Sequence, residues 1–249
     1  MNSDTKRLKE IAGYRLKMQR NYEPKLRALV DIRSKQLKLS DIERNRALKS
    51  IDALVWKLTA SGIHLERLWE NKESFAMQEL TKNILAGKRD PKRFTDREAA
   101  FLTAEFEAFL FQARAFISVA QVHTLDACRV SFGGMLTNEK YEDAIKNAPH
   151  EAKERLERAK QYFSNEVFAP GKWGDFLKQL RDRVAHFDRI RPSLAILEDG
   201  SEELKVARFS LERLAQDFEN GTYDLLVNVI APIWERKWQA GPYQPGMWE

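Results

Sequence analysis

The feature that most constrains the fold is a nearly unbroken apolar stripe in the middle of the chain. It comprises Leu102, Phe106, Phe109, Leu110, Ala113, Phe116, Ile117 and Ala120. This i, i+3, i+4, i+7 spacing places the whole set on one face of an α-helix, and it does not fit the strict alternation of a half-buried strand. Thr95, with Glu98 three residues later, can cap the start. We therefore predict a long helix from about residue 95, buried along this face.

The same periodicity recurs on both sides of this helix. It predicts helices over residues 8–16, 25–38, 40–69, 138–162, 172–189 and 210–238, and another short helix that ends near residue 86. Ser40 and Glu43 form a capping box at the start of the third of these. The only plausible β structure is a small hairpin, from residues 194–197 through Asp199-Gly200 to residues 204–206. The expected fold class is all-α, with this minor hairpin.

Charge and composition change near residue 93. Residues 1–93 hold 22 Lys and Arg against 12 Asp and Glu, a net charge of +10, whereas residues 94–249 have a net charge of −5. Residues 87–93 (GKRDPKR) have no apolar side chain other than proline, which is typical of a linker. We predict a basic helical region over residues 1–93 and a helical bundle domain over residues 94–249. The positive part favours an anionic partner, and a solvated helix surface is the alternative.

Several classes of protein are not expected from this sequence. It contains no apolar run of the roughly 20 residues that a membrane helix needs, and residues 1–13 do not resemble a signal peptide. We expect a cytoplasmic location and no membrane partner. Cys128 is the only cysteine, so an intrachain disulfide and a thiolate metal cluster are both excluded. The pattern favours a small buried hydrophobic residue at this position.

One short segment of the sequence contains residue types that are typical of a catalytic site. In the segment FLKQLRDRVAHFDRIRP (residues 176–192), Arg181 is followed by Asp182 and, five positions after the arginine, by His186. The segment, together with the long apolar helix before it and the hairpin and final helix after it, resembles the HEPN superfamily of helical bundles. The resemblance covers about residues 95–238. It implies a HEPN-like bundle and metal-independent ribonuclease activity, as in members that act in defence or toxin systems; other members use the bundle only to bind.

The residue types fit RNA cleavage. A histidine with a pKa near neutrality can take a proton from a ribose 2′-OH and return one to the leaving 5′-oxygen, while arginine stabilises the crowded phosphate. Asp182 lies one helical turn before His186, where it can accept a ring N–H and fix the tautomer. The alternative is that Asp182, His186 and Arg189 form an exposed ion-pair strip.

Helix geometry adds a constraint on this site. At about 100° per residue, Arg181 and His186 lie about 140° apart on a regular helix, so they diverge. They converge on one phosphate if the helix is irregular, or if a two-fold axis brings a second motif opposite the first. HEPN nucleases typically form such dimers. Phe111, on the far side of the long helix among Glu107, Arg114 and Ser118, indicates a surface suited to a partner. We expect a homodimer.

An acidic residue of the long helix is a further candidate for the site. Glu105, and Gln112 seven residues later, lie on the shoulder of the apolar stripe, where a half-buried carboxylate needs a cation such as Arg181. A structural salt bridge is the favoured role of Glu105, ahead of a catalytic one. The sequence has no Gly-rich phosphate loop, no nucleophile elbow and no paired carboxylates, and we expect no cofactor and no metal.

The function predicted from the sequence is therefore a metal-independent endoribonuclease of a prokaryotic defence or toxin–antitoxin type, with RNA as substrate. Arg181, His186, Asp182 and Glu105 are the candidate catalytic residues. An antitoxin protein is a further expected partner. The alternative is a catalytically silent HEPN-like module that binds a nucleotide, RNA or a protein.

Overall fold

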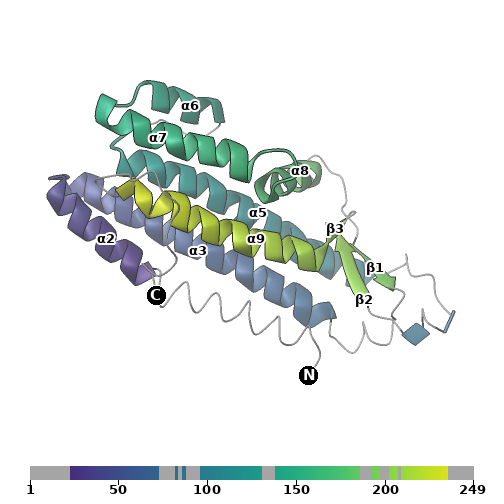
Figure 1. Cartoon of the computed structure of the whole chain (residues 1–249). Helices are drawn as coiled ribbons and strands as arrows, with labels where there is room; N and C mark the ends of the chain where they lie inside the picture. The colour runs from purple at the N-terminus through teal and green to yellow at the C-terminus, as the bar shows by residue number, and fades with distance from the viewer. Residues whose placement is uncertain are drawn as a thin grey trace.

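A computed structural model describes residues 23–72, 82–83, 86–87, 96–130, 138–185, 192–196, 202–206 and 209–234. Most of these residues are helical, which confirms the all-α class (Figure 1). The predicted helix over residues 8–16, the Thr95 cap and most of the 87–93 linker lie outside the described residues. None of the described helices is long and apolar enough to cross a membrane.

The first described helices are α2 (Glu23–Gln36) and α3 (Asp41–Lys72). The predicted capping box joins them: the Ser40 N–H donates to the Glu43 carboxylate at 2.8 Å, and the Glu43 N–H donates to Ser40 Oγ at 3.3 Å. These bonds satisfy backbone groups that have no partner within the helix. Lys38 adopts a positive φ of 51° in the turn before the cap. Gly62 does not interrupt α3, because the flanking apolar residues pack continuously.

Helix α3 packs antiparallel against α5 (Asp96–Ala127), the long helix predicted from the apolar stripe. Three side-chain pairs fix the register. His64 contacts Glu105 at 2.7 Å, Lys57 donates to Gln112 at 2.9 Å, and Ser50 contacts His123 at 2.7 Å. All members of the predicted stripe are buried, and they belong to one hydrophobic core that also includes the apolar face of α3. The boundary placed near residue 93 therefore does not separate two cores.

The next helices are α6 (Asn138–Lys146) and α7 (His150–Tyr162). The sequence predicted one helix here, and the structure corrects this to two, because the chain turns at residues 147–149. Pro149, at the N-terminal cap of α7, has no N–H to continue a helix. A π-helical turn, η2 (Phe163–Val167), extends α7, and α8 (Trp173–Ala185) follows.

A small antiparallel sheet lies at one end of the bundle (Figure 1). Strand β1 (Pro192–Ile196) pairs with β2 (Glu202–Val206) in the register Pro192↔Val206, and β2 pairs with β3 (Phe209–Ser210). β1 and β2 occupy the segment in which the sequence predicts a hairpin. β3 leads directly into the next helix.

The last described helix is α9 (Leu211–Leu225), capped by Ser210 Oγ, which accepts the Arg213 N–H at 3.4 Å. The sequence predicted one continuous helix over residues 210–238. Instead, a π-helical turn, η3 (Leu226–Ile230), and a 3-10 turn, η4 (Pro232–Trp234), follow α9, and residues 235–249 lie outside the described residues. The apolar stripe nevertheless stays buried through this change. Val229 in the π turn and Ile233 in the 3-10 turn are both fully buried.

Aromatic rings join α9 to the rest of the core. The Phe218 ring packs edge-on against Phe109 at 5.3 Å and against Trp173 at 5.9 Å between ring centroids. Gly221, one turn after Phe218, allows this arrangement, because a Cβ at this position would lie 2.3 Å from the Trp173 indole nitrogen. α8 and α9 therefore lie close to each other and to α5, and this fixes the position of the predicted motif on α8.

Candidate functional site: an arginine pair between α5 and α8

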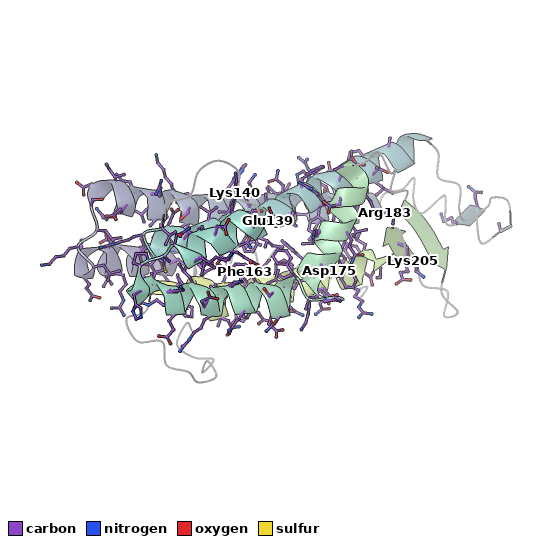
Figure 2. All side chains as sticks on the ribbon, turned by 90° about the horizontal axis from the view of Figure 1, so that it is seen from above. Glu139, Lys140, Phe163, Asp175, Arg183 and Lys205 are labelled. Atoms are coloured by element: carbon purple, nitrogen blue, oxygen red, sulfur yellow. The ribbon has the colours of Figure 1, made fainter. Side chains whose placement is uncertain are left out.

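Helix α8 carries the first half of the predicted motif. Its buried face consists of Trp173, Gly174, Leu177 and Leu180. Gly174 lies against η2, where a Cβ would come within 2.7 Å of the Val167 carbonyl oxygen. The Asp175 carboxylate, in the first turn of α8, accepts the N–H of Gly171, which lies just before the helix, at 3.1 Å. Figure 2 shows Asp175 near the start of α8 and Arg183 near its end, at the end of the bundle that carries Lys205 of the sheet. The site is thus anchored by packing on one side and open on the other.

Arg181 and Asp182 form an ion pair on the open side of α8. Arg181 Nη1 donates to Asp182 Oδ1 at 2.7 Å, and the two side chains are 42% and 40% exposed. Pairs this exposed contribute little to stability, because water and salt screen the attraction. The pair is therefore accessible to a ligand from solution, and an anionic ligand can compete for the guanidinium.

A second arginine, Arg114 of α5, lies beside this pair. Its guanidinium stacks over the Phe168 ring at 5.1 Å and donates to Ser118 Oγ at 3.1 Å. Burial lowers the pKa of Arg114, the charge of Arg181 lowers it further, and the charge of Asp182 opposes both. Arginine nevertheless remains protonated in proteins. Two positive charges thus lie near one carboxylate, Asp182, which is ion-paired with Arg181 and, among the described residues, not with Arg114.

The structure brings Arg181 and Asp182 together but does not describe the other half of the motif. His186 and Arg189 fall outside the described residues, since α8 is described only to Ala185. The predicted convergence of Arg181 and His186 and the predicted contact of Asp182 with the His186 ring therefore stay predictions.

Glu105 does not join this site. Its carboxylate is 13% exposed and contacts His64 Nδ1 at 2.7 Å and Arg67 Nη1 at 3.5 Å, both on α3. The cation expected from the sequence was Arg181. Glu105 and Arg114 are nine residues apart, which puts them on opposite sides of α5 at about 100° per residue. Because Arg114 faces Arg181, Glu105 faces away from it. Gln112 likewise turns to α3 and accepts from Lys57.

Of the two other described histidines, His150 is exposed at the start of α7, whereas His123 has structural surroundings. His123 is fully buried, and burial lowers its pKa to about 3. Its Nε2 accepts the Trp234 indole N–H at 2.9 Å, so a neutral ring carries its proton on Nδ1 and donates to Ser50 Oγ. Cys128 is also buried, which raises the pKa of the thiol to about 12 and confirms the role expected from the sequence. These groups are therefore part of the core.

Sequence reasoning assigned Arg114 to a partner surface and missed its place beside Arg181. The signal available was an arginine four residues before a serine, in a stretch (residues 108–120) whose only other polar side chain is Gln112.

Among the described residues, no group of three or more His, Cys, Asp or Glu side chains is arranged to hold a metal ion. An open depression at the start of α9, lined by Ser210, Glu212, Arg213, Gln216 and Asp217, is polar and holds an Arg213–Asp217 pair at 3.8 Å.

No protein-family model matches the chain, and neither the curated proteins nor the solved structures include a match to it. The residues of the site, and the motif to which they belong, are therefore the basis for a functional proposal.

Proposed function

We propose that this protein is a metal-independent endoribonuclease of a prokaryotic defence or toxin–antitoxin type, in which Arg181 and His186 act on the RNA backbone. The observation that carries the proposal is the excess of positive charge at the open side of α8. Arg114 lies within electrostatic range of Arg181 and Asp182, and within the described chain Asp182 is the ion-pair partner of Arg181 alone. Such a pair of arginines supports binding of a phosphate group, to which guanidinium groups bind in a bidentate manner.

The proposed reaction is a transesterification at phosphorus. His186 accepts the proton of the ribose 2′-OH, the 2′-oxygen forms a bond to the adjacent phosphorus, and the bond from phosphorus to the 5′-oxygen breaks. The leaving oxygen takes a proton from the imidazolium, which leaves a 2′,3′-cyclic phosphate and a 5′-OH. Arg181 stabilises the negative charge of the crowded phosphate in the transition state.

The homodimer expected from the motif geometry belongs to the same proposal. Phe111 on α5 is 45% exposed and Trp56 on α3 is 62% exposed. The side-chain pair Lys57–Gln112 places these two aromatic residues at the same level of the antiparallel helices. A two-fold contact through this face would cover apolar surface that is otherwise open to water. RNA as substrate and an antitoxin protein as partner complete the proposal.

The test is incubation of the protein with RNA in EDTA, followed by analysis of the product ends. Wild-type protein is expected to yield 2′,3′-cyclic phosphate ends. Arg181→Ala and His186→Ala should abolish cleavage. Helicity in circular dichroism should be unchanged for Arg181→Ala, because the Arg181 side chain is 42% exposed, and the same measurement checks the folding of His186→Ala. Arg213→Gln on α9, which removes an equal charge from an 83%-exposed side chain, is the matched control and should cleave normally.

A second candidate function is favoured by the Arg181–Asp182 ion pair itself. Arg181 is already neutralised by an adjacent carboxylate, an arrangement suited to a catalytically silent module that binds a nucleotide, RNA or a protein. RNA that remains intact under all conditions, while still binding to the protein, would favour this module over the nuclease.

A further inference from the structure

Arg114 has the properties of a preorganised anion-binding residue. Its guanidinium is held on two sides, by the Phe168 ring and by Ser118 Oγ. Held in this way, the side chain loses little further conformational freedom when a ligand binds. The Ser118 contact uses one of the five N–H donors of the guanidinium. Donors therefore remain for a ligand.

The charges around Arg114 are unbalanced. Among the described residues, no carboxylate lies within ion-pair distance of Arg114, and the nearby Asp182 is bonded to Arg181. Partial burial also lowers the local dielectric constant, which strengthens the interaction with a bound anion. By comparison, Arg27 and Arg44 on the opposite part of the bundle each have a carboxylate partner of their own.

We propose that Arg114 and Arg181 together bind a phosphate of the RNA backbone, and that this phosphate replaces Asp182 as the partner of Arg181. The proposal deepens the function given above, on which it rests for the identity of the ligand. Arg114 is a binding residue at this site and carries out no proton transfer. Asp182 is the partner of Arg181 before RNA binds, and Arg181 gives up this ion pair when the phosphate binds.

The experiment measures binding of a short 2′-O-methyl RNA, which has no free 2′-OH and cannot be cleaved by the proposed reaction. Fluorescence anisotropy is followed over a range of salt concentrations for the wild type, Arg114→Gln, Arg114→Lys and Asp182→Asn. Arg213→Gln is the control for charge, and thermal unfolding is the control for folding.

Arg114→Gln should weaken binding about tenfold and reduce the slope of log K against log[salt] by roughly 0.7, the change expected for one lost phosphate contact on a single strand. Arg114→Lys should keep the slope and bind more weakly, because lysine lacks the planar fork. Asp182→Asn should bind more tightly than the wild type. Arg213→Gln should leave the slope unchanged.

The proposal is overturned if Arg114→Gln and Arg213→Gln give equal slopes, or if the wild type does not bind the oligonucleotide. If Arg114→Gln does not fold, the test uses the other two variants. The proposal then requires that Arg114→Lys bind the oligonucleotide more weakly, and Asp182→Asn more tightly, than the wild type. Wild-type protein that binds the oligonucleotide through Arg114 but leaves unmodified RNA intact would support the phosphate site and contradict the nuclease. Cleavage that is normal in Arg114→Gln, with an unchanged slope, would contradict the phosphate site alone.

Discussion

The indole N–H of Trp234 donates to Nε2 of His123 at 2.9 Å, and this bond ties the end of the described chain to the C-terminal part of α5. The ring is bonded on its other side to Ser50 Oγ, which in turn donates to the Ala47 carbonyl oxygen at 2.8 Å. Every donor in this buried chain of groups has an acceptor. Such satisfied networks stabilise one arrangement of a core, because any shift leaves a polar group without a partner.

The His123 network predicts a loss of stability in acid. Burial lowers the pKa of His123 to about 3 in the folded protein, whereas the unfolded value is near 6.5. The unfolded state therefore binds the extra proton as the pH falls from 6.5 towards 3, and the free energy of unfolding decreases by about 1 kcal/mol per pH unit. His123→Gln should make the decrease between pH 6 and pH 4 shallower, as measured by urea denaturation. An unchanged dependence on pH would contradict this assignment.

Asp126, one turn after His123, has the opposite effect. Burial raises its pKa to about 6 in the folded state, although Arg46 at 3.6 Å lowers it in part. Because the pKa of Asp126 is higher in the folded chain than in the unfolded chain, where it is 3.8, protonation of Asp126 favours the folded state. This contribution is fully present at pH values below 3.8 and is lost as the pH rises through 6. Asp126 thus offsets part of the acid loss from His123. Asp126→Asn should steepen the decrease in unfolding free energy between pH 6 and pH 4; a slope equal to that of the wild type would show that Asp126 does not titrate in this range.

Gly221→Ala should destabilise the protein by about 2 kcal/mol, because the new methyl group overlaps the rigid indole of Trp173. The measurement is the free energy of unfolding in urea for Gly221→Ala, Trp173→Ala and the double variant. The cost of Gly221→Ala should be much smaller once the indole has been removed, since helix propensity alone favours alanine. Equal costs in the two backgrounds would mean that the clash is not the cause.

Glu105→Gln should lower the free energy of unfolding by about 1 kcal/mol and leave RNA cleavage unchanged. The substitution removes the carboxylate charge that faces His64 and Arg67 across the α3–α5 contact, at a position that faces away from Arg181. Cleavage at 25 °C and thermal unfolding measure the two effects. A large loss of cleavage in a variant that remains folded would restore the catalytic role first considered for Glu105.

Phe111→Glu and Trp56→Glu should weaken the proposed dimer, since each places a charge in a face that a partner would cover. Sedimentation velocity at micromolar concentration is the measurement. Ile42→Glu is the matched control, because Ile42 is 81% exposed and lies at the start of α3, several turns from Trp56. A wild type that sediments as a monomer, or an equal effect of Ile42→Glu, would contradict a dimer through this face.

Removal of residues 1–93 is not a usable test of their expected contribution to phosphate binding. The sequence led us to expect that this basic region adds affinity for nucleic acid without supplying chemistry. Because α3 buries Ile51, Leu54 and Leu58 in the same core as α5, deletion would expose that core. Substitution of exposed basic side chains such as Lys35, with the salt slope as the measurement, is the form of the test that the structure permits.

The sequence by itself determined the helices and their boundaries where the signal is local. The Ser40–Glu43 cap depends on residues three apart, and the α5 stripe depends on a repeat that any helix imposes. Only the tertiary structure decided which helices pack together. The partners of Glu105 lie 38 and 41 residues away on α3, and Arg114 meets Arg181 across 67 positions of sequence. A periodic pattern gives the angle of a side chain around its own helix, but the neighbour at that angle depends on how the helices are arranged in space.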